Sequence, residues 1–201
     1  NLGISSIEVD YLDDNFDEKK QQTNLTGTFS STLLQQAKAV NSVRTIKTNS
    51  GGLYTNAGTV KIYTNLSGGG VAKPLAFIPI NASISQSPQY CVPSGHILLI
   101  HKLSVISHCE DEATLNINKY KWENVSAILQ IKKEKLKSFS LHSNQEWEHT
   151  VNWVINEKER FTISGLTNTI PTGINKINIQ LFGYLKKIKL SPISDYKFNE
   201  L

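Results

Sequence analysis

The chain has 201 residues, of which 39% are hydrophobic and 19% are charged, and its formal net charge is +4. Only Arg44 and Arg160 of its 21 basic residues are arginines. Because proteins that read nucleic acids favour arginine for bidentate contacts, the modest basic excess is only weak support for a nucleic-acid partner, and we expect none. The longest uninterrupted apolar run, Ile97–Ile100, is far shorter than the roughly 20 residues of a membrane-spanning helix. We expect neither a membrane partner nor a signal peptide.

The composition and the spacing of apolar segments predict an all-β protein. Aromatic and β-branched residues are plentiful, and Ser, Thr and Asn fill the remaining positions. Strand candidates recur with turn signals between them, which is typical of a sandwich rather than of βαβ units. We predict one antiparallel β-sandwich of the jelly-roll type over residues 1–189. Residues 190–201 show no clear pattern, and we expect this C-terminal tail to pack on a neighbouring copy.

The first predicted element is a hairpin. Ile7, Val9 and Tyr11 alternate with polar residues, and the turn residues at 13–15 lead to a second polar strand. The next apolar pattern covers Phe29–Leu34, and the stretch at 32–40 is the one with a helical composition.

A strand over residues 39–48 follows, with Val43 and Ile46 as its expected core residues. In the next one, Val60, Ile62 and Thr64 share the inward face.

The second half of the chain predicts further strands. Pro93-Ser94-Gly95 forms a tight turn before a long strand at 97–107, which is apolar on both faces near its start and is therefore expected to be central. In the last strand, Ile177, Ile179 and Leu181 oppose Asn178, Gln180 and Phe182. The strands predicted after the long one cover residues 113–120, 126–133, 137–142, 151–155, 160–166 and 176–186.

The two cysteines are expected to be free thiols. If the turn at 93–95 makes a hairpin, Cys91 pairs near Leu98, and Cys109 lies about 36 Å away at about 3.3 Å per residue. A disulfide requires Cα atoms within about 7 Å. The chain contains no Met, including at its first position. We expect it to be trimmed, or to be the ordered part of a longer product.

No residue pattern predicts a catalytic, cofactor-binding or metal site. Residues 107–112 ("SHCEDE") place His108 and Cys109 beside three carboxylates, but they lack the ligand spacing of a metal site and read better as a polar turn. The other histidines are scattered, without a catalytic triad or a nucleophile elbow. We therefore predict no catalytic residues, no cofactor and no metal.

The aromatic residues allow two interpretations. Trp122, Trp147 and Trp153, with Tyr90 and Tyr120, are compatible with a sugar-stacking platform like those of carbohydrate-binding β-sandwiches. Aromatic side chains on strands are more often part of a core.

The order of the segments resembles a family of virion-associated structural proteins of tailed, mainly marine, bacteriophages. Residues 56–59 ("NAGT") match one of its turn motifs, and residues 90–95 ("YCVPSG") match another, with Ser94 where alanine is more usual. The similarity covers about residues 6 to 187. The chain departs from the family at 129–135, where lysines replace an arginine-rich strand, so the charge contacts of those arginines are not carried over.

The resemblance implies a non-enzymatic structural protein of the virion, in the capsid, its decoration, or the neck and tail, assembled in the host cytoplasm. Its partners would be other virion proteins. Because the first hairpin is acidic and the later strands are basic, we also expect copies of the chain to associate, with a homotrimer as the first choice. The alternative to this association is a monomer that these charges keep soluble. The alternative is a carbohydrate-binding or host-attachment module resembling a lectin, with glycans as partners.

Overall fold

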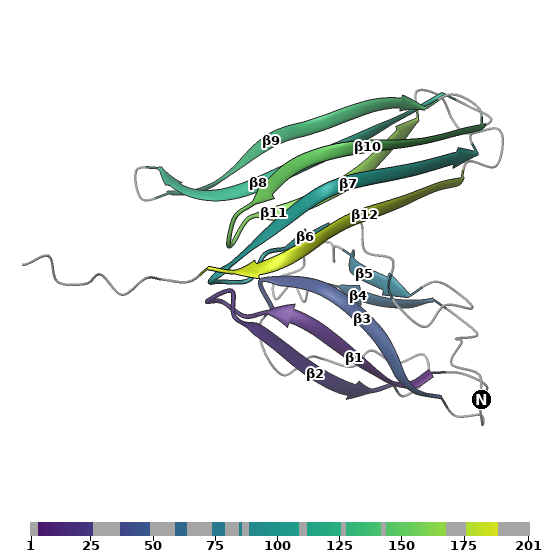
Figure 1. Cartoon of the computed structure of the whole chain (residues 1–201). Coiled ribbons are helices and arrows are strands. Elements are labelled where there is room, and N and C mark those ends of the chain that lie inside the picture. Colours follow the sequence, from purple (N-terminus) through teal and green to yellow (C-terminus); the bar gives the residue numbers. More distant parts are fainter. Residues whose placement is uncertain are drawn as a thin grey trace, which may run out of the picture.

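The computed structural model describes residues 4–25, 37–48, 59–63, 74–78, 85, 89–108, 112–125, 128–141, 144–167 and 176–188. The regular elements in these ranges are all strands (Figure 1). They are β1 (Ile4–Leu12), β2 (Glu18–Asn24), β3 (Ala39–Thr48), β4 (Val60–Tyr63), β5 (Pro74–Ile78), β6 (Gln89–Cys91), β7 (His96–His108), β8 (Ala113–Val125), β9 (Ile128–Leu141), β10 (Asn144–Ile155), β11 (Arg160–Thr167) and β12 (Lys176–Lys187). The all-β prediction is confirmed.

The strands form four open sheets in which every described pairing is antiparallel. Their orders are β2-β1-β3, β4-β5, β10-β7-β12 and β6-β11-β8-β9. In Figure 1 the strands β1 to β5 make a lower group and the strands β7 to β12 an upper group, with the short β6 close to where the groups meet. Among the described residues, no helix is long and apolar enough to cross a membrane.

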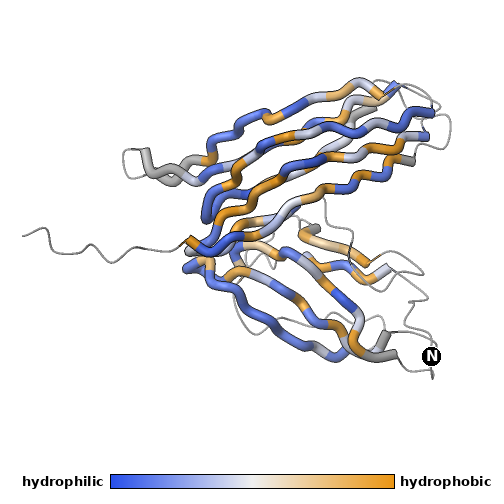
Figure 2. The backbone as a smooth tube through the Cα atoms, viewed as in Figure 1, coloured by the Kyte–Doolittle hydropathy of each residue, from blue (hydrophilic) through white to orange (hydrophobic). Residues whose placement is uncertain are grey.

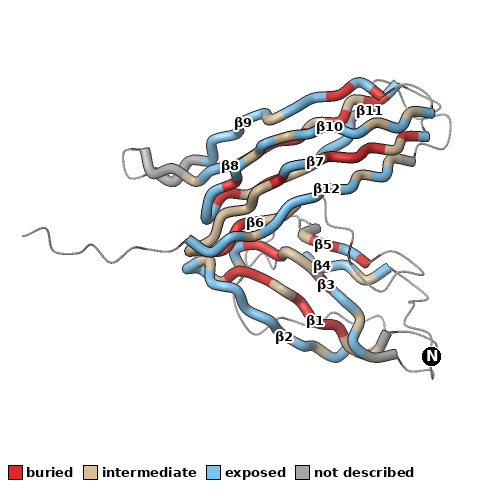
Figure 3. The backbone as a smooth tube through the Cα atoms, viewed as in Figure 1, coloured by how far each residue is buried: buried red, intermediate tan, exposed pale blue. Residues whose placement is uncertain are grey.

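Apolar and polar residues alternate along many of these strands (Figure 2), and the buried positions in Figure 3 follow the apolar ones. The sheets β10-β7-β12 and β6-β11-β8-β9 share one hydrophobic cluster, with Leu103, Val105, Leu115 and Ile117 at its centre. A second cluster lies among β1, β3 and β5. Burial of one face of each sheet thus accounts for the period-two pattern of the sequence.

Several sequence predictions are confirmed by these cores. Ile7, Val9 and Tyr11 are buried on β1, which pairs with β2 as the predicted hairpin. The long strand β7 is the central strand of its sheet. Val60 and Ile62 pack against the second cluster, whereas Phe29–Leu34, Thr64 and most of the predicted helical stretch lie outside the described residues. The end of that stretch is not helical, because Ala39 and Val40 begin β3.

Three expectations about the strands were wrong in detail. Ile46 is 37% exposed rather than buried, because residues three positions apart on a strand face opposite sides and Val43 faces the core. Leu181 lies opposite the buried Leu103 but is 36% exposed, since β12 is an edge strand. The two strands predicted at 126–133 and 137–142 are the single strand β9, which continues past a register shift opposite Ile117.

Candidate functional site

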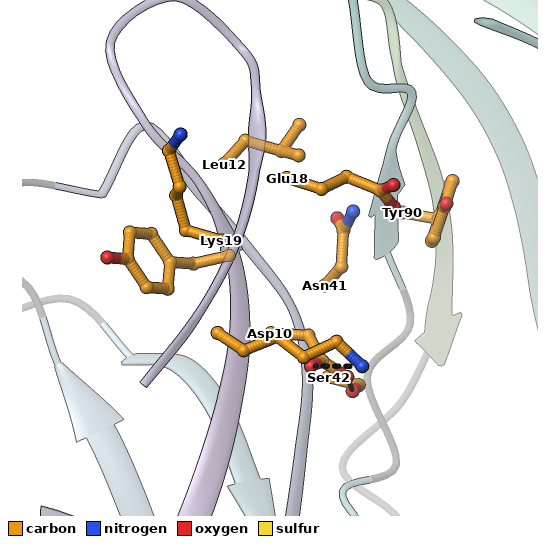
Figure 4. A pocket seen from close by; sticks show the side chains of 9 residues that line it. Asp10, Leu12, Glu18, Lys19, Asn41, Ser42 and Tyr90 are labelled. Atoms are coloured by element: carbon orange, nitrogen blue, oxygen red, sulfur yellow. Dashed lines mark hydrogen bonds and ion pairs between the residues drawn. The ribbon is translucent and has the colours of Figure 1, made fainter. Parts of the chain in front are cut away.

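A polar pocket of about 330 Å³ lies where the sheet β2-β1-β3 meets β6 (Figure 4). It is lined by Asp10, Tyr11, Leu12, Glu18, Lys19, Lys20, Asn41, Ser42 and Tyr90. Its volume is within the range of small-molecule sites, which is about 300 to 1,000 Å³. The pocket is the candidate functional site of the described residues.

One cross-strand row builds the floor of the pocket. Asp10 lies opposite Lys20 on β2 and opposite Ser42 on β3, so the three side chains share a face of the sheet. Ser42 Oγ donates a hydrogen bond to Asp10 Oδ2 at 2.6 Å, and Lys20 Nζ lies 3.6 Å from Asp10 Oδ1. The Asp10 carboxylate is thereby held in place by both neighbouring strands.

The next row along the same face is also ionic. Arg44 Nε donates to Glu8 Oε1 at 2.8 Å, and Gln22 Nε2 donates to Glu8 Oε2 at 3.2 Å. The hydrogen bonds from Arg44 and then Gln22 lower the pKa of Glu8 below its ordinary 4.5. The sheet thus carries two consecutive charged rows, of which the row of Asp10 lines the pocket.

Strand β6, which carries the lining residue Tyr90, is fixed to the sheet β2-β1-β3 by hydrogen bonds that involve its main chain and the turn after it. Asn41 Nδ2 donates to the carbonyl oxygen of Cys91 at 2.9 Å, and the Cys91 amide donates to Asn41 Oδ1 at 2.9 Å. The Ser94 amide donates to the Phe16 carbonyl oxygen at 2.9 Å. Beside these bonds, Leu12, Ala39 and Cys91 form a small buried cluster. The pocket therefore has a rigid frame.

Two titratable groups of β6, the phenol of Tyr90 in the pocket lining and the thiol of Cys91 next to it in sequence, have raised pKa values. Burial, followed by the charge of Glu18, raises the pKa of the Tyr90 phenol to about 12. Figure 4 shows Glu18 extending from β2 toward Tyr90 on β6. Burial also raises the pKa of the Cys91 thiol to about 12. Near neutral pH, neither group is ionised as a nucleophile would be.

This arrangement offers groups that can bind a polar molecule. The carboxylate of Glu18, the ammonium of Lys20 and the phenol of Tyr90 offer acceptors and donors around one space. A neutral polyhydroxylated molecule, such as a sugar, would suit this mixture of groups, and the ring of Tyr90 supplies an apolar surface.

The residues considered for a metal site do not come together where they are described. Among the described residues, no group of three His, Cys, Asp or Glu side chains could hold a metal ion. His108 Nδ1 lies 3.0 Å from Asn144 Oδ1, while Cys109, Glu110 and Asp111 lie outside the described residues. His149 packs against Phe139, with ring centroids 5.5 Å apart.

The tryptophans do not gather on one exposed face. Trp147 and Trp153 pack against the main hydrophobic cluster, where the ring of Trp147 lies 4.6 Å from that of Phe139. Trp122 lies elsewhere, with its ring 5.4 Å from the ring of Phe16 and 5.6 Å from the guanidinium of Arg160. Of the five aromatic residues considered as a sugar platform, Tyr90 alone lines the pocket.

Sequence reasoning missed the pocket itself. Asp10, Glu18 and Ser42 look like ordinary polar positions of solvated strands, and only the register of β1 with β2 and β3 places them together. The alternation around Asp10 was the one available signal. It predicts that Asp10 lies on the face of β1 opposite the core, but it does not predict which residues of β2 and β3 lie beside it. Comparisons of the chain with protein-family models, with curated proteins and with solved structures find no match.

Proposed function

We propose that the chain is a non-enzymatic structural protein of a tailed-bacteriophage particle, as a capsid-associated, decoration or neck-tail component. The proposal starts from the resemblance of the turn motifs at 56–59 and 90–95. It places the chain in the virion after assembly in the host cytoplasm, with other virion proteins as partners. No cofactor or nucleic acid takes part in this role.

The observation that carries the proposal is the junction between the two groups of sheets. The reciprocal Asn41–Cys91 hydrogen bonds and the Ser94–Phe16 bond join main chain from distant parts of the sequence. Gln89 Nε2 adds a bond to the Leu75 carbonyl oxygen at 3.0 Å. Such links make the two groups a stiff unit, which suits a component that transmits load and performs no chemistry.

The fine architecture that we propose is a jelly-roll-like β-sandwich forming one domain over residues 1–189. The shared cluster between β10-β7-β12 and β6-β11-β8-β9 supports face-to-face packing of two sheets. The buried contacts of Leu12 and Ala39 with Cys91 at the junction support the assignment of β1 to β5 to the same domain.

We further propose that copies of the chain associate as a homotrimer. The open sheets end in β2, β3, β4, β5, β6, β9, β10 and β12, and edge strands favour pairing with another chain unless they are blocked. Lysines on β9, namely Lys132, Lys133, Lys135 and Lys137, would meet an acidic surface such as the β1–β2 turn of a neighbour. Light scattering at several salt concentrations tests this, because a trimer held by these charges dissociates as salt rises.

Electron microscopy of purified particles tests the virion role. Antibodies raised against the folded chain and marked with gold should decorate intact particles at a fixed position, such as the head, the neck or the tail. Antibodies against a host cytoplasmic protein serve as the control. Gold confined to the background between particles would refute the proposal.

The second candidate function is glycan binding. The observation that supports it is the polar pocket and not the tryptophans, which do not gather on one exposed face. The substitution Tyr90→Ala should abolish binding to a responsive glycan on an array, while Trp153→Ala should lower stability without a specific loss of binding. If the chain binds no glycan on the array, glycan binding is refuted and the structural role is the remaining candidate function.

A further inference from the structure

The lining of the polar pocket includes two lysines and two carboxylates, and three of these four charged groups already have a partner. Lys20 Nζ lies 3.6 Å from Asp10 Oδ1. Lys19 Nζ lies 3.6 Å from Oδ2 of Asp13, which follows β1 and lies outside the pocket lining. The positive charges of both lysines are therefore balanced within the chain.

The carboxylate of Glu18 is the charge of the pocket that remains unbalanced. Among the residues that the structure describes, it forms no ion pair and no hydrogen bond. Glu18 is the first residue of β2 and lies opposite Leu12, whose apolar side chain offers it no polar partner. Its side chain is exposed, so a ligand can reach it. One negative charge without a partner favours a cation in the pocket.

Tyr90 approaches this carboxylate from β6. Figure 4 shows the side chain of Glu18 extending toward Tyr90. After burial, the charge of Glu18 is the next cause of the raised pKa of the phenol, which agrees with this proximity. The phenol is neutral near neutral pH, and its ring offers an electron-rich face to a cation. An anionic group beside an aromatic ring is a combination that binds ammonium groups.

The other polar side chains of the pocket are engaged with the protein. The side-chain amide of Asn41 bonds both main-chain groups of Cys91, and Ser42 Oγ donates its proton to Asp10. These bonds fix the shape of the pocket. Recognition of a charged ligand is therefore left to Glu18 and to the ring of Tyr90.

We propose that the pocket binds a saccharide that carries a free amino group, with its ammonium held between the Glu18 carboxylate and the Tyr90 ring. The hydroxyl groups of the sugar meet the polar groups of the lining. This inference rests on the second candidate function, glycan binding, and adds the charge of the ligand. It does not depend on a role in the virion.

A neutral or acetylated sugar satisfies this pocket less well. Its hydroxyl or amide group brings no positive charge, so the Glu18 carboxylate loses water without gaining an ionic partner. An exposed ion pair and a cation–π contact are each modest, and together they correspond to about tenfold in affinity.

NMR titration of the isotope-labelled full chain tests the proposal with glucosamine, N-acetylglucosamine and glucose, which differ at a single position of the ring. At slightly acidic pH this position carries an ammonium, a neutral amide or a hydroxyl group. Glucosamine should shift the amide signals of β1, β2 and β6 and bind about tenfold more tightly than the other two sugars. High salt should reduce this preference, because it screens exposed charges. Methylamine, which has the charge without the sugar ring, should bind more weakly than glucosamine.

Two variants locate the charge that selects the ligand. Glu18→Gln removes the charge and nearly keeps the shape of the side chain, so its affinity for glucosamine should fall to its affinity for glucose. Glu146→Gln is the matched control, because Glu146 is an exposed carboxylate on β10 outside the pocket lining. It should leave the preference for glucosamine unchanged.

The possible failures are distinguishable. Equal affinity of the native chain for the three sugars, or an undiminished preference in Glu18→Gln, would overturn the proposal and leave glycan binding standing. Methylamine binding as tight as that of glucosamine would also overturn it, because the site would then select charge alone. If none of the sugars shifts the signals of β1, β2 and β6, glycan binding at the pocket is refuted together with the proposal.

Discussion

Asn41 and Cys91 are joined by two hydrogen bonds of equal length, in which the side-chain amide of Asn41 pairs with both main-chain groups of Cys91 at 2.9 Å. Asn41 is on β3 and Cys91 ends β6, so a side chain of the first sheet takes the place of a neighbouring strand. Together with the Ser94–Phe16 bond, the pair links the two groups of sheets directly.

Loss of this link should destabilise the whole chain. Asn41→Ala leaves the amide and the carbonyl of Cys91 without their partner, and a buried unsatisfied polar group costs about 1 to 3 kcal/mol. Urea unfolding monitored by tryptophan fluorescence measures the change. Asn178→Ala, at an exposed position of β12, serves as the control and should change the free energy of unfolding by less than about 0.5 kcal/mol. Equal effects of the two substitutions would contradict the role given to Asn41.

Substitutions at inward-facing residues of β4 and β12 should lower the free energy of unfolding more than substitutions on the exposed faces. Ile62 and Ile179 are partly buried and pack against the two main clusters, so Ile62→Ala or Ile179→Ala should cost about 2 kcal/mol, near the lower end of the range for buried positions. Lys61→Ala, on the exposed face of β4, should cost little. Similar losses from Lys61→Ala and Ile62→Ala in thermal unfolding would mean that the register of β4 is wrong.

Gly183 is required by the close approach of two strands. A Cβ atom at this position would lie 2.4 Å from the carbonyl oxygen of Leu99, where β12 and β7 shift register. Gly183→Ala should therefore lower the free energy of unfolding by about 1 to 3 kcal/mol, as overpacking does. Gly165→Ala is the matched control, because a Cβ atom there meets nothing within 4 Å. A neutral Gly183→Ala together with a destabilising Gly165→Ala would contradict the structure of β12.

The thiol of Cys91 should be inert in the folded chain. Burial raises its pKa from 9.0 to about 12, and iodoacetamide reacts with thiolates. In a Cys109→Ser background, native protein at pH 8 should stay unlabelled, while protein unfolded in urea should be labelled once. Rapid labelling of the native protein would contradict this burial.

The same pKa shift predicts a pH dependence of stability. The folded chain holds the thiol proton more tightly than the unfolded chain, so this contribution is fully present below about pH 9 and is lost as the pH rises toward 12. The free energy of unfolding should thus fall more steeply between pH 9 and pH 11 in the native sequence than in Cys91→Ala. Parallel curves for the two proteins would show that the thiol is not buried.

The sequence predicted the positions and buried faces of the strands better than it predicted which strands pair with one another. Period-two alternation identified the buried faces around Val9 and Ile179, since each strand hides one face. It failed for Ile46 because a spacing of three cannot keep two residues on one face of a strand. It also divided β9 in two, because the lysine-rich middle of that strand has no apolar alternation to follow.

The pocket could not be predicted for a different physical reason. Asp10 and Ser42 are 32 positions apart, and Tyr90 is farther still along the chain. Their proximity depends on strand register and on the Asn41–Cys91 bonds, neither of which leaves a local pattern. The sequence predicted that Cys91 is a free thiol but did not predict that it is buried. Its burial depends on the cluster with Leu12 and Ala39.

Quantitative mass spectrometry of purified phage particles tests the central proposal most directly. Peptides of this chain, measured against those of the major capsid protein, should give a fixed copy number per particle that survives washing in high salt and repeated density gradients. A copy number divisible by three would agree with the proposed trimer. Particles free of the chain, with all of it recovered from the soluble fraction of the lysate, would contradict a structural role in the virion.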